Sequence, residues 1–158
     1  MPPLVFRSMV ADGAGMKPQI ANDANSLGVR VAHETGGAFD ITVESDLVQP
    51  GREGMSVSPS PQALPFHRIP RRLKAPVPAH LGIPSGRNDA VCWRAGEGLF
   101  ADAPFAEGLQ FMTQPEGSKM HGVIAPAVTT PLTAFRSALA ATQPMWQSER
   151  WPWEGAAS

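Results

Sequence analysis

The density of prolines and glycines is the feature that most limits what this chain can fold into. The 158 residues include 17 prolines and 15 glycines, about a fifth of the sequence. Proline removes a backbone donor and cannot continue a helix interior, and both residues mark turns. The sequence therefore predicts many short elements joined by turns rather than long helices.

Length and composition indicate a single domain that spans residues 1–158. Apolar residues make up 42% of the chain and charged residues 17%, a balance that allows a modest core and differs from that of disordered chains. The net charge of −1 does not indicate a nucleic acid or an anionic membrane as partner. The single cysteine, Cys92, excludes an internal disulfide.

The sequence contains no candidate membrane span, because no stretch approaches ~20 apolar residues. The start, Met1-Pro2-Pro3-Leu4, lacks the charged and apolar regions of a cleaved secretion signal. These features predict a cytoplasmic protein. A protein with this sequence that acts in another cell would have to be delivered without a cleaved leader.

Short runs of β-favouring or alternating residues predict a set of strands. The runs are 4–10, 28–31, 39–43, 55–58, 90–93, 109–112 and 120–126, with turns at 12–15 and 117–119. We expect residues 20–27 to form one helical turn or an irregular loop, because cap- and turn-favouring residues dominate them.

The best helix candidate is 131–143. Thr130 suits the N-cap, Pro131 the first helical position, and Pro144 stops the helix. The expected buried stripe is Leu132, Phe135 and Leu139, with Arg136 facing solvent. Trp146, Trp151 and Trp153 follow in a tail that we expect to pack against the body. The fold class is α+β, with compact, mixed, mainly antiparallel sheets and one C-terminal helix.

The segment 51–61 presents two hydroxyls next to flexible backbone. Ser56 and Ser58 face one way on a short strand and Val57 the other. Gly54 lets the backbone turn tightly or approach a ligand, and Pro59 ends the strand. The segment is either a ligand-facing edge or a short edge strand with two solvated serines.

Arg7 is the only charge in the first strand candidate, where it shares a face with Val5 and Met9. The opposite face carries Leu4, Phe6 and Ser8. A lone arginine among apolar neighbours is either an edge-strand guard against aggregation or a buried, paired anion binder. The sequence leaves both interpretations open.

A long loop, 59–86, contains seven prolines and no regular pattern. Loops of this length are usually functional or disordered. Its segment 67–74 holds four of the 13 lysines and arginines, one of which is Arg68. This basic cluster could contact a pyrophosphate, a nucleic acid backbone or an acidic partner, or it could be solvated without a role.

Several common kinds of site have no support in the sequence. A metal site is not indicated, because there is one cysteine and His33, His67, His80 and His121 lack ligand spacing. No glycine-rich phosphate loop precedes a helix, and 54–58 departs from a nucleophile elbow at its last position. A nucleophilic pair of Ser56 or Ser58 with His121 remains open.

The order of the polar strand residues is the most informative pattern. An arginine in the first strand precedes Ser56 and Ser58 in a middle strand, then a further strand and the helix. Enzymes that consume NAD need an arginine to bind the phosphate or ribose, and a strand serine to support the nicotinamide ribose. They also need a polar or acidic group that stabilises the charge as nicotinamide leaves.

Five segments resemble a family of small bacterial toxins: 4–7, 27–30, 54–58, 64–70 and 121–126. The family is similar to a small cytoplasm-acting toxin that is delivered by type VI secretion and has an ADP-ribosyltransferase-like fold. The resemblance implies a compact toxin domain that transfers ADP-ribose from NAD to an unknown cytoplasmic target. It also implies a cognate immunity protein as partner.

By position, the resemblance implies that Arg7, Ser56 and His121 are catalytic, with Ser56-Val57-Ser58 in the family's serine motif. It implies NAD-binding roles for Arg7, Ser56 and Ser58. We expect Gly54, which allows close approach of a ligand, and Arg68, in the basic cluster, to contribute to the same NAD site. Two features depart from the family pattern. The chain has no tyrosine to stack on nicotinamide, which leaves an Arg-Ser type of transferase or a Phe or Trp in place of the tyrosine, and it has no Glu-x-Glu motif. Glu149 is the nearest imitation but follows the helix, so the catalytic acid is unassigned.

A second hypothesis is a non-enzymatic binding protein. In that case the proline-rich basic loop would meet an acidic partner, and the serine strand would be an edge open to strand addition. The missing acid and the long loop motivate this alternative.

Overall fold

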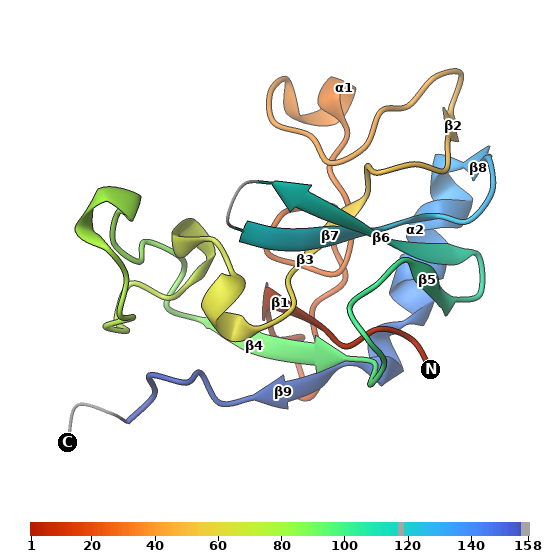
Figure 1. Ribbon diagram of the computed structural model, residues 1–158. Coiled ribbons are helices and arrows are strands. Elements are labelled where there is room, and N and C mark those ends of the chain that lie inside the picture. The colour runs from red at the N-terminus through yellow and green to blue at the C-terminus, as the bar shows by residue number, and fades with distance from the viewer. Residues whose placement is uncertain (117–118, 156–158) are drawn as a thin grey trace.

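Two antiparallel sheets and one helix surround a common core in this computed structural model, which describes residues 1–116 and 119–155 (Figure 1). The first sheet has the order β1 (Val5–Val10), β4 (Ala90–Ala95), β9 (Gln147–Glu149). The second has the order β3 (Met55–Val57), β7 (Lys119–Pro126), β6 (Leu109–Glu116), β5 (Ala103–Ala106). A pair of short strands, β2 (Leu47–Val48) and β8 (Thr130–Pro131), leads into α2 (Leu132–Ala141), and α1 (Ala32–Thr35) is a single turn. Every pairing between these strands is antiparallel, which confirms the expected α+β class.

The main core lies between the two sheets and α2. Alternate residues of each strand point into it, as the period of two requires. The buried side chains that fill it include Val5, Met9, Met55, Val57, Trp93, Phe111, Ile124, Phe135, Leu139 and Trp146. The Phe100 and Phe111 rings meet edge to face with centroids 4.7 Å apart. The opposite face of the first sheet carries a smaller core under the proline-rich loop.

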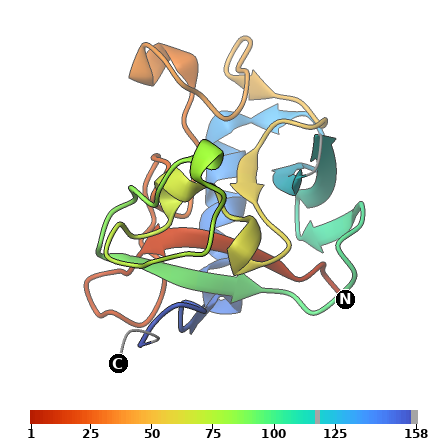
Figure 2. The same cartoon turned by 60° about the vertical axis from the view of Figure 1, so that its left-hand side comes forward.

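This smaller core shows what the other face of β1 does. Its buried members are Phe6, Leu64, Ile69, Leu73, Cys92 and Trp151. Loop residues 59–89 lie over β1 and β4 on the side away from α2 (Figure 2). The two faces expected for β1 are therefore confirmed, with Phe6 in the smaller core and Val5 and Met9 in the main one. Burial raises the pKa of the Cys92 thiol to about 12, so this thiol stays protonated.

Five of the expected strands are confirmed, and two are wrong. Residues 28–31 and 39–43 are not strands, although Val29, Val31 and Ile41 are buried. The two segments share one backbone hydrogen bond, from the Asp40 N–H to the Arg30 carbonyl at 3.0 Å, but no ladder follows, because the Arg30 N–H donates to the Asp40 carboxylate at 2.7 Å. The expected loop character of 20–27 and the turn at 12–15 are confirmed. The turn expected at 117–119 falls mainly on residues 117 and 118, outside the described ranges.

The C-terminal helix begins one residue later than expected. Pro131 is its N-cap and Leu132 its first residue, whose N–H donates to the Asp46 carbonyl at 2.9 Å. The predicted buried stripe is confirmed. The expectation that Arg136 faces solvent is wrong, because its guanidinium pairs with Glu34 at 2.7 Å and donates to the Val29 carbonyl. Trp146 and Trp151 are buried, so the tail packs as expected.

The proline-rich loop contains three single turns of 3-10 helix, at Pro61–Ala63, Phe66–Arg68 and Ala79–Leu81. Each follows or contains a proline, whose fixed backbone angle suits such a turn. No α-helix or strand is present between 59 and 86, all of which the structure describes, as the sequence predicts.

Gly122 in the middle of β7 is fixed by packing. A Cβ there would lie 2.5 Å from the buried Phe111 ring, closer than any real contact. We predict that Gly122→Ala lowers the free energy of unfolding by about 1–3 kcal/mol, because the ring has no room to move. Gly13→Ala is the matched control, since a Cβ at Gly13 meets nothing within 4 Å. Urea denaturation measures both, and equal stability of the two variants would contradict the packing argument.

Candidate functional site

The candidate site lies where the two sheets separate. Phe6 and Ser58 exchange two backbone hydrogen bonds, of 2.8 and 2.9 Å, and form a single bridge between β1 and the end of β3. In a continued antiparallel ladder, the next two residues to exchange backbone hydrogen bonds would be Ser8 and Ser56. Instead, β1 continues along β4 and β3 continues along β7, so the strands diverge and leave an opening.

The opening is a cavity of about 280 Å³. Its lining comes from β1, β3, β7, the start of the proline-rich loop and residues 24–40: Arg7, Ser8, Ala24, Arg30, Asp40, Ser56, Val57, Ser58, Ala63, Leu64, Pro65, His67, Arg68 and His121. Three arginines and one aspartate are the charged members of this lining. The cavity therefore has an excess of positive charge, and anionic groups are the ligands that it favours.

The pairing of β3 with β7 explains why His121 reaches the cavity. The register places Ser56 opposite Val123 and Val57 opposite Gly122. Side chains alternate along a strand, so His121, two residues from Val123, shares the face of Ser56. Val57 lies at the rim of the main core on the other face. No hydrogen bond joins His121 to Ser56 or Ser58 in the part of the chain that the structure describes.

Arg7 closes the gap between the diverging strands. Its Nη1 donates to the Ser56 carbonyl at 2.7 Å, and its Nε and Nη2 donate to the Ser26 carbonyl at 3.2 and 2.9 Å. Nη2 also donates to the Ala24 carbonyl at 3.4 Å. The side chain is buried, so it is not an exposed edge guard. Burial lowers the pKa of Arg7 to about 10, and the more distant Asp40 offsets this only in part.

Arg30 and Asp40 form an ion pair at one wall of the cavity. Asp40 Oδ1 accepts from Arg30 Nη2 at 3.0 Å, and Oδ2 accepts from Nε at 3.1 Å. The hydrogen bond to Asp40 raises the pKa of Arg30 above its usual value. The pair is neutral overall, so the excess charge of the cavity comes from Arg7 and Arg68.

Of the three arginines in the cavity lining, Arg68 is the one whose guanidinium has no hydrogen-bond or ion-pair partner among the described residues. Its backbone, in contrast, is held on two sides. The Ser8 hydroxyl donates to the Arg68 carbonyl at 2.7 Å. Gly86 packs against the same backbone, because a Cβ there would lie 2.7 Å from the Arg68 carbonyl carbon. Burial lowers the pKa of the half-buried Arg68 guanidinium, and the neighbouring Arg30 charge adds to this effect.

The structure brings most of the sequence-predicted site residues together. Arg7, Ser56, Ser58, Arg68 and His121 all line the cavity. Gly54 does not line the cavity, and a glycine is needed at this position for another reason. A Cβ on Gly54 would lie 2.2 Å from the Ile124 carbonyl oxygen, so the glycine allows β3 to approach β7 rather than a ligand.

Two other expectations for the site do not fit the cavity. Glu149 lies in β9 at the far side of the first sheet, where it pairs with Arg94 at 2.8 Å. No Phe or Trp is present in the cavity lining, so a stacking substitute for tyrosine is missing from the described residues there. Ser8, Arg30 and Asp40 also line the cavity but were not among the predicted site residues. Arg30 and Asp40 lie in runs that were expected to be strands.

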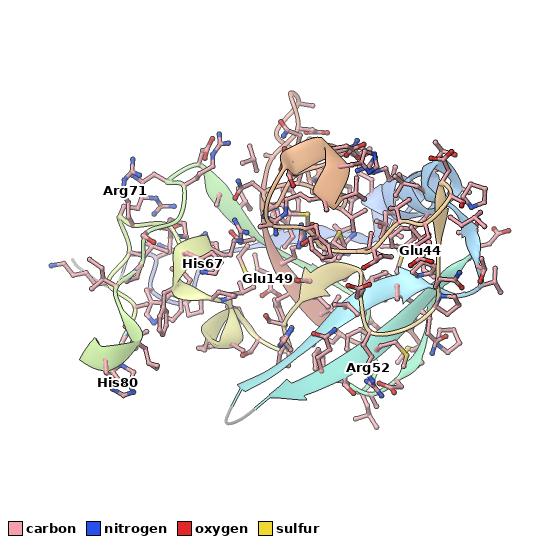
Figure 3. All side chains as sticks on the ribbon, turned by 90° about the horizontal axis from the view of Figure 1, so that it is seen from above. Glu44, Arg52, His67, Arg71, His80 and Glu149 are labelled. Carbon is pink, nitrogen blue, oxygen red and sulfur yellow. The ribbon has the colours of Figure 1, made fainter. Side chains whose placement is uncertain are left out.

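The residues of the basic cluster at 67–74 have different surroundings. Figure 3 shows His67 close to the centre of the molecule, whereas Arg71 and His80 lie on the outer part of the loop. Arg68 lines the cavity, and Arg72 pairs with Glu154. Arg71 and Lys74 are exposed. The cluster is therefore not one continuous binding patch.

Neither a group of metal-binding side chains nor a membrane-spanning helix is present among the described residues. No group of three or more His, Cys, Asp or Glu side chains that could hold a metal ion occurs among the described residues. No helix in residues 1–116 and 119–155 is long and apolar enough to cross a membrane. Comparison with protein-family models, curated proteins and solved structures found no match.

The contacts of Arg7 and Arg68 predict that their substitution by alanine has unequal effects on stability. Arg7→Ala leaves the Ser26 and Ser56 carbonyls without their donor, so we predict a loss of about 3 kcal/mol in the free energy of unfolding. Arg68→Ala removes a charge without internal partners, and we predict a change below about 1 kcal/mol. Urea denaturation of both variants measures this. Similar losses for the two would contradict a structural role for Arg7 and a free role for Arg68.

Proposed function

We propose that the chain is an ADP-ribosyltransferase-like toxin that binds NAD in the cavity between the diverging sheets. The observation that carries the proposal is the convergence of Arg7, Ser56 and His121, from three strands far apart in sequence, on one cationic cavity.

The charge of the cavity supports a dinucleotide as ligand. NAD carries two negative charges on its diphosphate, and Arg7 and Arg68 supply two uncompensated positive charges. Ser56 is exposed and offers its hydroxyl to the nicotinamide ribose. A cavity of about 280 Å³ holds only part of a dinucleotide, so the adenosine end would extend over the surface.

In the proposed reaction, the bond between ribose C1′ and the nicotinamide nitrogen breaks. Its electron pair stays with nicotinamide, which leaves as a neutral molecule. A lone pair of the acceptor then forms the new bond to C1′, and the acceptor proton passes to a base. His121 is the imidazole that the cavity offers for this proton.

The charge that develops on the ribose needs an anionic group nearby. Asp40 is the only carboxylate in the cavity lining, and it takes the place that the missing Glu-x-Glu motif leaves open. Its pairing with Arg30 fixes its direction. In this proposal, the protein acts on a cytoplasmic target and is held inactive by a cognate immunity protein in the cell that makes it.

The first prediction concerns NAD binding. We expect wild-type protein to bind NAD, and Arg68→Ala to weaken binding roughly 10- to 100-fold, because a charge-assisted contact with the diphosphate is lost. Arg71→Ala is the matched control, since this exposed arginine lies on the same loop outside the cavity. Isothermal titration calorimetry gives the affinities. Absence of NAD binding by the wild type would overturn the proposal.

The second prediction concerns catalysis. We expect wild-type protein to release nicotinamide from NAD and to arrest the growth of a host that expresses it. Ser56→Ala and His121→Ala should reduce nicotinamide release at least roughly 10-fold and restore growth at matched expression. Ser60→Ala, a serine outside the cavity, should behave as wild type. Equal growth of the host with all four proteins would remove the toxin assignment.

A non-enzymatic binding protein is the second candidate function. The observation that favours it is the exposure of Leu81 and Ile83 on the same loop that carries the exposed Arg71 and Lys74. An acidic partner with an apolar patch would complement this surface. In that case, Arg71→Ala and Lys74→Ala would weaken partner binding while nicotinamide release stays undetectable in every variant.

A further inference from the structure

We propose that the charged end of the cavity is a diphosphate site in which Arg68 contacts the dianion and Ser8 positions Arg68. This inference rests on the cavity of the proposed function, but it names the contacting group and the residue that holds it. It differs from the expectation drawn from the toxin family, in which the first-strand arginine binds the cofactor.

Arg7 has little capacity left for a ligand. A guanidinium has five N–H donors, and four hydrogen bonds of Arg7 go to the carbonyls of Ser26, Ala24 and Ser56. These carbonyls belong to the two segments that Arg7 ties to β1. Its charge still acts on the cavity, whereas its donors are occupied. Arg7 therefore supports the site without being its main contact.

Arg68 has the opposite properties. Its guanidinium lines the cavity and has no internal hydrogen bond or ion pair among the described residues. Its planar fork can donate two parallel hydrogen bonds to one phosphate group. Holding a half-buried cation without a counter-charge is unfavourable, and a bound dianion removes that cost.

The Ser8 hydroxyl fixes the position of the Arg68 backbone. In a continued ladder, Ser8 would lie opposite Ser56, but the strands have separated there. The Ser8 hydroxyl donates instead to the Arg68 carbonyl at 2.7 Å, and the side chain is 4% exposed. Gly86 contacts the Arg68–Ile69 backbone from the other side and accepts no side chain. These contacts fix the position of the loop that carries Arg68 relative to β1, the strand that carries Arg7.

The ligand chemistry is that of two linked phosphates with two negative charges. The cavity has two positive charges beyond the neutral Arg30–Asp40 pair, and the described residues of its lining offer the hydroxyls of Ser56 and Ser58 but no lysine. A diphosphate can come from a dinucleotide or from free inorganic pyrophosphate. The two sources share the contacts proposed here. They differ in the rest of the molecule and in charge, because the unesterified ends of free pyrophosphate add negative charge.

A double-mutant cycle tests the inference. The affinities of wild type, Ser8→Ala, Arg68→Ala and the double variant are measured by calorimetry with inorganic pyrophosphate and, separately, with NAD. We expect wild type to bind pyrophosphate, Ser8→Ala to bind roughly 3- to 10-fold more weakly, and Arg68→Ala roughly 10- to 100-fold more weakly. The double variant should match Arg68→Ala alone, because Ser8 acts through Arg68. Arg71→Ala should bind as wild type does.

Several results would overturn the inference. They are no pyrophosphate binding by the wild type, no loss on Ser8→Ala, or the same loss from Ser8→Ala with and without Arg68. Melting temperatures confirm that each variant is folded. If Ser8→Ala does not fold, Gly86→Ala displaces Arg68 from the other side, and its loss of affinity must likewise disappear in the Arg68→Ala background.

The test separates this inference from the proposed function. Pyrophosphate binding with Ser8–Arg68 coupling, but without NAD binding, would leave the diphosphate site intact and reject the NAD-dependent activity. NAD binding without that coupling would reject the roles of Ser8 and Arg68 and leave the proposed function standing. Tighter binding of NAD than of pyrophosphate identifies the dinucleotide as the source of the diphosphate.

Discussion

The buried guanidinium of Arg7 is the interaction on which the rest of the structure depends. Two sheets that part after a single bridge expose backbone carbonyls that a continued ladder would have satisfied. Arg7 donates to the Ser56 carbonyl across that gap and to the carbonyls of Ala24 and Ser26 in the loop that follows β1. The cavity exists because one side chain replaces a stretch of β-ladder. Its positive charge follows from the same replacement.

The sequence predicted the local features of this arrangement well. The alternation around β1 indicated which residues face each core, and the prolines correctly excluded α-helix and strand from 59–86. Ser56, Ser58 and Arg68 were singled out from residue type and neighbours, and the structure places all three at the cavity. Alternation and proline act over a few residues, so a single sequence records them.

The failures concern what depends on distant partners. Residues 28–31 and 39–43 have the apolar content of strands, but they form no ladder. Asp40 N–H donates to the Arg30 carbonyl, whereas the Arg30 N–H donates to the Asp40 carboxylate. Arg136 was expected in solvent, because its partners Glu34 and Val29 are about a hundred residues away. The sequence also did not indicate β2, β5, β8 or β9, which are short and lie at sheet edges or beside turns. Pairing order, and with it the meeting of His121 with Ser56, is a property of the whole chain.

The surroundings of Cys92 have a consequence for where this fold can persist. The only thiol of the chain lies in the smaller core against Phe6 and Trp151, protonated and shielded from solvent. No covalent cross-link within the chain can form or break when the surroundings change from oxidising to reducing. The fold of residues 1–158 therefore does not depend on an internal disulfide, whichever redox buffer surrounds it.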